Sequence, residues 1–173
     1  MSGITQPFIS ELEHEAKSTR RVLERVPADK LDWQPHPKSM KLGQLALHVA
    51  NLPGAFARMG RLESFDASQA NFTPPMPQSV DDLVPALETG VADARSFLSE
   101  LDEKSAFAPW RFMHGERELM TLPRLGLVRT LMFNHMYHHR GQLVVYLRLL
   151  DVPVPSVYGP SADENPFANA PVV

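Results

Sequence analysis

Residues 123–150 read PRLGLVRTLMFNHMYHHRGQLVVYLRLL, and apolar or aromatic side chains recur in them at steps of three or four. That spacing places these side chains on one face of an α-helix. Pro123 suits an early helical position, where its missing N–H donor costs nothing. The segment therefore predicts a long helix with two histidines in its buried row, which comprises Leu125, Val128, Met132, His135, His139, Leu143, Tyr146 and Leu150.

Three further segments carry the same helical periodicity. The first spans about residues 7–26, the second begins near Met40, and the third follows Ser79, whose hydroxyl can cap a helix. We expect Pro53 to kink or break the second helix, because proline removes a backbone donor. Four amphipathic helices without long strands predict an all-α four-helix bundle, built as a single domain over residues 1–173.

The segments between these helices are expected to be irregular. Residues 61–78 contain three prolines and predict a loop that is long for a compact domain. Residues 110–120, with His114 and Gly115 in the middle, are compatible with a short hairpin. The proline-rich tail from Asp151 predicts an extended or looped segment that wraps the bundle.

The composition excludes several classes of site and partner. The 173 residues include no cysteine, so a bound metal would need nitrogen and oxygen ligands. A net charge of -3 disfavours nucleic acid as the main partner. The apolar stretches are too interrupted to cross a membrane, and the polar start of the chain does not resemble a signal peptide. We therefore expect a cytoplasmic protein.

Three histidines form a candidate metal site. His135 and His139 lie one helical turn apart, so their imidazoles point the same way and can share one ion. His48 edges the apolar face of the second helix and can join them if the second and fourth helices pack together. The competing interpretation is that these are ordinary core or surface histidines, and His138 is an alternative to His139 as a ligand.

Four segments also resemble a known family. They read WQPHPKSM at residues 33–40, LALHV at 45–49, NHMYHHRGQL at 134–143 and VPSVYGPSADE at 154–164. The chain resembles the DinB-like superfamily, which includes proteins described as YfiT-like metal-dependent hydrolases. The resemblance implies an up-down-down-up bundle that commonly forms a homodimer. It also implies that His48, His135 and His139 bind one divalent metal ion, which is zinc, nickel, iron or manganese in family members.

The resemblance implies a metal-dependent enzyme acting on a small-molecule substrate. Some relatives transfer or isomerise substrates with a low-molecular-weight thiol, and a histidine-bound divalent ion can activate such a thiol or a water molecule. The chain shows no obvious carboxylate base beside the three histidines, which weakens the hydrolase interpretation. The alternatives are a non-catalytic metal-binding or stress-related protein and a metal-free interaction module.

Five other residues are candidates for a role around the site. Trp33, His36 and Tyr158 are candidate pocket walls for a cofactor or substrate, although plain packing competes for Trp33 and Tyr158. Arg140 is expected either to support the substrate or to form a structural ion pair. Gln142 is expected either to support the substrate or to satisfy a buried polar contact.

Overall fold

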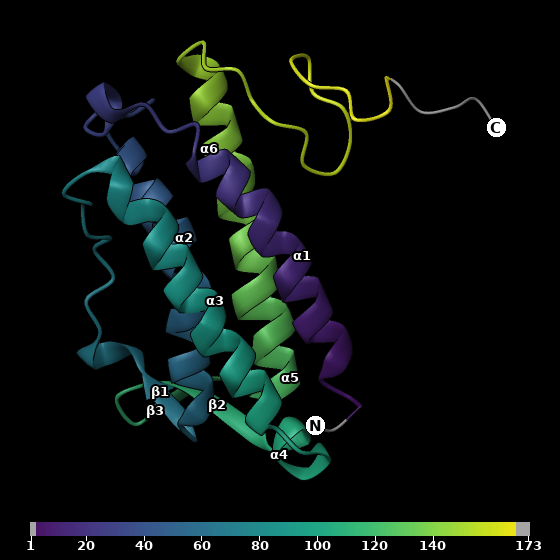
Figure 1. Ribbon diagram of the computed structural model, residues 1–173. Helices are drawn as coiled ribbons and strands as arrows, with labels where there is room; N and C mark the ends of the chain where they lie inside the picture. Colours follow the sequence, from purple (N-terminus) through teal and green to yellow (C-terminus); the bar gives the residue numbers. More distant parts are fainter. Residues whose placement is uncertain (1–2, 169–173) are drawn as a thin grey trace.

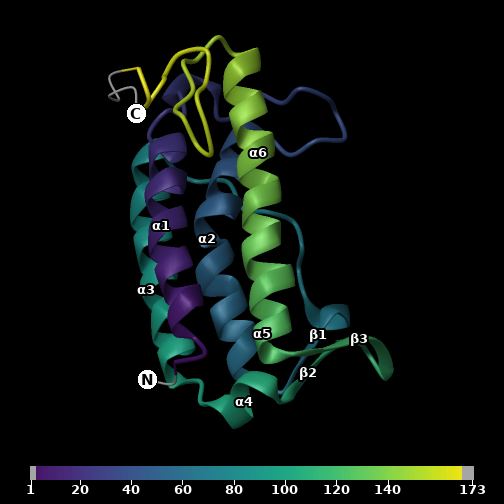
Figure 2. The ribbon, with the colours of Figure 1, turned by 90° about the vertical axis from the view of Figure 1, so that its right-hand side faces the viewer.

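Four long helices lie side by side in the computed structural model, which describes residues 3–168. They are α1 (Gln6–Leu23), α2 (Leu42–Arg61), α3 (Leu83–Glu100) and α6 (Asn134–Leu149) (Figures 1 and 2). Helix α1 contacts α3, α3 contacts α2, α2 contacts α6, and α6 contacts α1, so the four enclose a common core. Helices α1 and α6 run in one direction and α2 and α3 in the other. The predicted helical architecture is therefore confirmed.

A long connection makes the parallel pair α2 and α3 possible. It returns along the length of the bundle between the end of α2 and the start of α3 (Figure 2). It contains strand β1 (Ser64–Asp66) and two single 3₁₀ turns, η2 (Ala67–Gln69) and η3 (Val80–Asp82). The Ser79 hydroxyl accepts a hydrogen bond of 3.1 Å from the Asp81 N–H, so Ser79 caps the 3₁₀ turn η3, which leads directly into α3.

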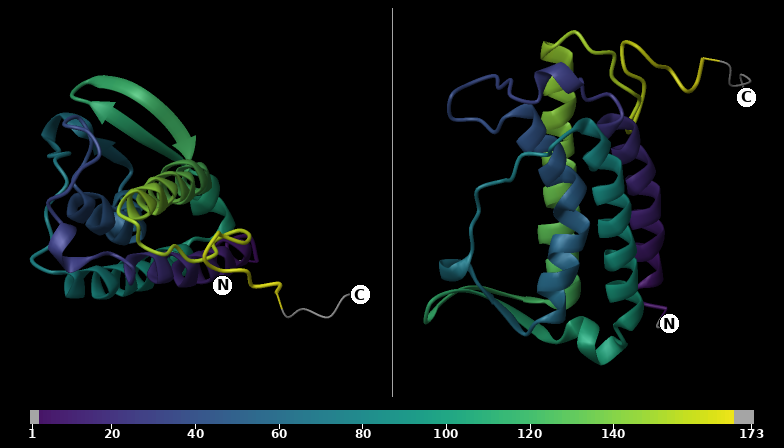
Figure 3. Two further views of the ribbon diagram at one scale, coloured as in Figure 1. Left: turned by 90° about the horizontal axis from the view of Figure 1, so that it is seen from above. Right: turned by 60° about the vertical axis from the view of Figure 1, so that its left-hand side comes forward.

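A three-stranded sheet corrects the all-α prediction. Strand β1 pairs in parallel with β2 (Pro109–His114), which pairs antiparallel with β3 (Arg117–Pro123). The predicted hairpin is thus confirmed, while the prediction of a plain loop over 61–78 is wrong at β1. Gly115 adopts φ +58° in the turn, a backbone region that glycine enters without strain. The hairpin projects from the end of the bundle where α2 ends (Figure 3).

Helix α2 passes through Pro53 without a break. The helix is continuous from Leu42 to Arg61, and Pro53 is buried within it, so the break that was one of the two expected outcomes does not occur. Close approach to α3 is possible here because both helices carry glycine: a Cβ added at Gly54 would lie 2.9 Å from the Cα of Gly90. This contact brings the backbones of α2 and α3 together over the middle of the bundle.

The predicted fourth helix is assembled from three parts. Pro123 ends β3, and the helical course then comprises α5 (Arg124–Leu127), a π-helical segment η4 (Val128–Phe133) and α6. A π turn holds more residues than an α turn, so it rotates the positions that follow. The fully buried residues of α6 are consequently Met136, Arg140, Leu143 and Leu147, and the predicted row is displaced by one position at the histidines.

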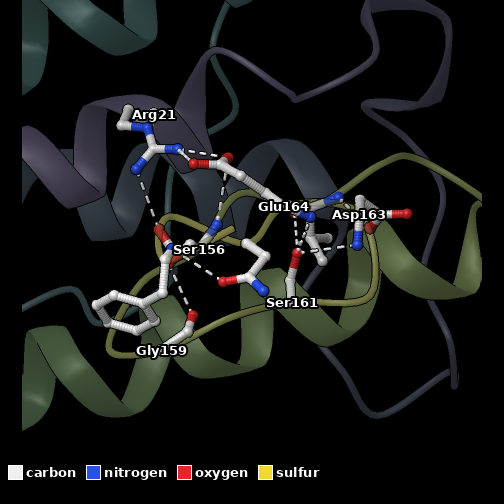
Figure 4. Close-up of polar contacts among 9 residues, drawn as sticks. Arg21, Ser156, Gly159, Ser161, Asp163 and Glu164 are labelled. Carbon is white, nitrogen blue, oxygen red and sulfur yellow. Dashed lines mark hydrogen bonds and ion pairs between the residues drawn. The ribbon is translucent and has the colours of Figure 1, made fainter. Parts of the chain in front are cut away.

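The tail packs against α1 and α6 near one end of the bundle. Arg21 of α1 forms an ion pair with the Glu164 carboxylate and donates to the Ser156 carbonyl at 3.2 Å, and Figure 4 draws both contacts. The Ser161 hydroxyl donates to the Val154 carbonyl at 2.8 Å and accepts the backbone N–H of residue 164 at 2.9 Å. These polar contacts and the burial of Val154 in the core together hold this looped segment against the bundle.

A short helix, α4 (Glu103–Phe107), joins α3 to the sheet. The indole of Trp110, at the start of β2, is fully buried and donates to the Met59 carbonyl of α2 at 3.0 Å. This hydrogen bond connects β2 of the sheet to α2 of the helix bundle. Within residues 3–168, no helix combines the length and apolar character needed to cross a membrane.

Candidate metal centre

The imidazoles of His48, His135 and His139 converge between α2 and α6. The Nε2 atoms of His135 and His139 are 2.8 Å apart, and those of His48 and His135 are 3.4 Å apart. One ring nitrogen from each residue lies within 4.8 Å of the other two. The structure therefore brings together the three histidines that the sequence pattern singled out, and we call them the His triad.

Helix packing positions the three rings. His48 lies in the first half of α2, between buried Leu45 and Val49, and α2 packs directly against α6. His135 and His139 occupy consecutive turns of α6, on the row beside its fully buried residues. All three histidines are half-buried rather than sealed in the core. The π-helical segment accounts for this position, since it turns the histidine row toward α2 and the surface.

Gln142 orients the ring of His139. Its side-chain Oε1 lies 2.8 Å from His139 Nδ1. An amide oxygen can only accept, so Nδ1 carries the proton in this contact and the lone pair remains on Nε2. That nitrogen faces the other two rings. Such an outer hydrogen bond is the usual way in which proteins fix the tautomer of a metal-binding histidine.

The electrostatic environment keeps the rings neutral. Burial, followed by the neighbouring imidazoles, lowers the pKa of His48 to about 4, and burial together with His139 and His138 lowers the pKa of His135 to about 4. The pKa of His139 is also lowered, mainly by burial. Neutral imidazole is the form that binds metal, so the triad has no proton to lose at neutral pH.

An apolar pocket of about 180 Å³ adjoins the triad. It lies where the sheet, the end of α2, the connection after α2 and the η4 segment meet. Its lining is almost entirely apolar, and His135 contributes to its wall. We call it the sheet pocket; its residues are Phe56, Met59, Phe65, Phe72, Phe112, Met120, Leu131 and His135.

A second polar cluster lies on the side of α6 that faces α1. Arg140 is 1% exposed and forms an ion pair of 2.6 Å with the carboxylate of Glu15. It also donates to the Thr19 hydroxyl at 3.0 Å and to the Tyr158 hydroxyl at 2.5 Å. The Tyr158 hydroxyl in turn donates to Glu15 at 3.0 Å. We call these four residues the Arg140 cluster, and they show that Arg140 forms a structural ion pair.

The three candidate pocket walls lie in different surroundings. Trp33 is half-buried and meets the ring of Tyr146 edge to face, with centroids 5.6 Å apart. His36 is exposed, and its Nδ1 accepts the Lys38 N–H at 3.1 Å. Tyr158 belongs to the Arg140 cluster. The structure thus groups the triad with the sheet pocket, and it places none of these three among the residues that line that pocket.

The remaining histidines lie outside the triad. His138 is exposed, although its ring centroid is 4.8 Å from that of His139. His14 and His114 are also exposed. Of the carboxylates near α6, Glu11 pairs with Arg129 and Tyr137, and the pairing with Arg129 lowers the pKa of Glu11. None of these residues joins the triad within the described part of the chain.

Sequence reasoning missed Glu15 and the sheet pocket. Glu15 follows Leu12 by three positions on α1 and lies on its buried face, where Thr19 and Val22 continue the row. A carboxylate on an apolar face was therefore a readable signal for a buried cationic partner. The pocket residues come from four separate segments, and no local spacing connects them.

Comparison with known proteins agrees with this fold. The chain is 24% identical over 166 residues to the uncharacterized protein YrdA of Bacillus subtilis strain 168, covering 91% of this chain and 89% of that protein. The crystal structure of a DinB-like protein from Bacillus cereus ATCC 10987 superposes with a TM-score of 0.69 at 24% identity, covering 87% of this chain and 95% of the other.

A second solved structure, of a DinB-like protein from Bacillus subtilis, matches with a TM-score of 0.66 at 19% identity, covering 88% of this chain and 97% of the other. At these sequence identities the two solved structures show a similar fold and nothing more specific. The family model of the DinB family matches residues 1–166, nearly the whole sequence. The chain described here belongs to the DinB family.

Proposed function

We propose that this protein is a metal-dependent enzyme that holds one divalent metal ion with His48, His135 and His139. The observation that carries the proposal is the convergence of three ring nitrogens from two helices within 4.8 Å. A small-molecule substrate, a cytoplasmic location and a homodimer accompany this proposal as expectations from the family resemblance.

The spacing of the nitrogens suits a shared ion. Two imidazole nitrogens bound to zinc at about 2.1 Å would lie roughly 3.4 Å apart in a tetrahedral site and about 3.0 Å apart at an octahedral edge. The separations of 3.4 Å and 2.8 Å are close to these values. Three nitrogen donors are compatible with zinc, nickel, iron and manganese, so the donor set does not select one of them.

The chain's own residues supply the surroundings for the chemistry. When bound at three neutral imidazoles, a divalent ion lowers the pKa of a water molecule or thiol and makes it a nucleophile near neutral pH. Gln142 keeps the lone pair of His139 directed at the ion, and three ligands leave further coordination positions open.

The external nucleophile that we favour is a low-molecular-weight thiol. Within residues 3–168, no carboxylate joins the triad, so a protein group that could act as a base toward water is not part of this cluster. The chain itself has no cysteine. A thiol reaction would therefore use a thiol carried by a small molecule. Its sulfur would bond to an electrophilic carbon of the substrate as a leaving group such as chloride departs, and the thiol proton would pass to solvent.

Metal titration of protein purified without a nickel column tests the site. We expect one ion per chain and, at 100 times the dissociation constant, a stabilisation of about 2.7 kcal/mol. For a chain of this size that raises the melting temperature by roughly 5–10 °C. His48→Ala and His139→Ala should abolish the rise, whereas His138→Ala, on the exposed neighbour, should keep it. Equal metal binding by the native protein and the first two variants would refute the triad.

The enzymatic part of the proposal has its own test. The metal-loaded protein is incubated with bacillithiol, mycothiol or glutathione and the electrophile 1-chloro-2,4-dinitrobenzene, and thioether formation is followed by absorbance. We expect conjugation with one of the thiols that disappears on chelation and in His48→Ala. Metal binding without conjugation by any thiol would leave a metal-binding protein and contradict the transferase assignment.

A further inference from the structure

We infer that the sheet pocket receives a single aryl group, or an aliphatic group of similar size, belonging to the small-molecule substrate. This inference rests on the proposed function, because it assigns part of the substrate of the same site. Its starting point is that one residue, His135, contributes both to the triad and to the wall of the pocket.

The size of the pocket limits its occupant. Its volume is about 180 Å³. A cavity of about 150 Å³ lined by apolar side chains is large enough to bind benzene. One six-membered ring therefore fits the sheet pocket, whereas a fused pair of rings would need part of its surface outside.

The lining of the pocket selects for apolar, aromatic chemistry. Phe65 of β1 and Phe112 of β2 stack with ring centroids 6.0 Å apart and an interplanar angle of 14°. Met59 and Met120 add flexible, polarisable side chains, which pack well against ring edges. A charged or strongly hydrated group would lose its water here without gaining a partner. The pocket thus favours the uncharged ring of a substrate.

The position of His135 connects the occupant to the reaction centre. Its ring is 5.6 Å, centroid to centroid, from that of Phe56, which also lines the pocket. The Nε2 of the same imidazole faces His48 and His139. An aryl group in the pocket would therefore lie beside a ligand of the proposed ion. The expected substrate class is an aryl-bearing electrophile.

Metal-free protein labelled with ¹³C at the methionine methyl groups allows a direct test with benzyl alcohol as the probe. We expect saturable shifts of the Met59 and Met120 methyl signals. The Met40 methyl signal should not shift, since Met40 lies near the other end of the bundle, where its carbonyl accepts a hydrogen bond from the Tyr146 hydroxyl. Ethylene glycol, which has no ring, should leave all three signals in place.

A matched pair of variants sharpens the test. Met120→Trp fills the pocket and should weaken benzyl alcohol binding at least tenfold, read from the Met59 signal. Leu119→Trp adds the same side chain at the adjacent position of β3, which is 46% exposed and does not line the pocket, and it should bind as the native protein does. Circular dichroism shows whether Met120→Trp is folded. If it is not folded, the benzyl alcohol titration of the native protein alone tests the pocket assignment.

The outcomes separate this inference from the proposed function. Absence of saturable shifts at Met59 and Met120 in the native protein, or unchanged binding in folded Met120→Trp, overturns the pocket assignment even when metal binds. If added metal does not bind at the triad, the proposed function is refuted, and the assignment of the ring to its substrate fails with it even when benzyl alcohol binds in the pocket.

Discussion

Two polar clusters lie on opposite sides of α6, and the consecutive residues His139 and Arg140 belong one to each. The Arg140 cluster faces α1 and is electrically closed, because the guanidinium meets the Glu15 carboxylate and its other donors meet hydroxyl and carbonyl oxygens. The His triad faces α2 and is open, because three neutral nitrogens meet mainly one another. The closed cluster has its charges paired within the protein, whereas the open one is an arrangement that could hold a metal ion.

This difference distinguishes polar residues that stabilise the fold from polar residues that could bind a ligand. Burying an ion pair costs hydration energy that the partners recover from each other, so such a cluster serves the fold. The His triad has no charged partner of this kind, and its ring nitrogens lie within hydrogen-bond distance mainly of one another. Whether the partners of a polar residue satisfy its hydrogen bonds and charge is therefore more informative than its presence on a buried helix face.

The largest effect is expected from a variant that removes the ion pair of the Arg140 cluster. Arg140→Met leaves the carboxylate of Glu15 buried without its partner, and the side chains concerned are only 2% and 8% exposed. We expect the free energy of unfolding, measured by urea denaturation, to fall by about 3–5 kcal/mol. The double variant Glu15→Leu with Arg140→Met should recover most of that loss, because no charge then remains unpaired.

Arg129 provides the matched control for that experiment. It pairs with Glu11 of α1 from the η4 segment, which directly precedes α6, but its side chain is 42% exposed. Arg129→Met should therefore cost about 1 kcal/mol or less. Wherever Arg140→Met remains folded, its metal affinity should stay near that of the native protein. A loss as large as that in His139→Ala would show that the two clusters are not independent.

A smaller effect is expected from the outer hydrogen bond of the open cluster. Gln142→Met removes the acceptor for His139 Nδ1, while Gln142→Glu retains one. Loss of such a partner typically weakens metal affinity by about 10–100-fold. We expect that range for Gln142→Met and near-native affinity for Gln142→Glu, measured by calorimetric titration of zinc. Equal affinities in both variants would show that this hydrogen bond does not orient the ligand.

The features that the sequence predicted well are those set by local spacing. The four helices follow from apolar steps of three and four, and the Ser79 cap follows from the chemistry of one side chain. The i, i+4 pair His135 and His139 follows from helix geometry alone. The convergence with His48 needed one further assumption, that α2 packs against α6, and the structure supports it.

The features that the sequence did not predict depend on contacts between distant segments. The three residues of β1 become a strand because β2 pairs with them, and no local pattern marks them. The π-helical segment displaced the buried row of α6 by one position, so Arg140 is buried deeply and the histidines are not. Tyr158 is placed by a tail whose course depends on ion pairs such as Arg21 with Glu164.

The smallest effect concerns the pH dependence of the open cluster without metal. The pKa values of His48 and His135 are lowered from 6.5 to about 4, so between these values the unfolded chain binds more protons than the folded one. Stability from the neutral rings is then complete above pH 6.5 and is lost as the pH falls toward 4. Because the rings are half-exposed, we expect about 1 kcal/mol or less per ring rather than the full shift.

Thermal unfolding in the presence of a chelator, between pH 7 and pH 5, measures this loss. The native protein should melt at progressively lower temperature across that range, while His48→Gln with His135→Gln should show a flatter dependence, since glutamine does not titrate. His36→Gln removes an exposed histidine and should leave the native slope. Carboxylates with lowered pKa, such as Glu11, lose their contribution only at lower pH, so they do not produce the slope in this window. If the melting temperature of the double variant depended on pH as that of the native protein does, burial would not be what keeps the triad neutral. Its histidines would then resemble ordinary solvated side chains.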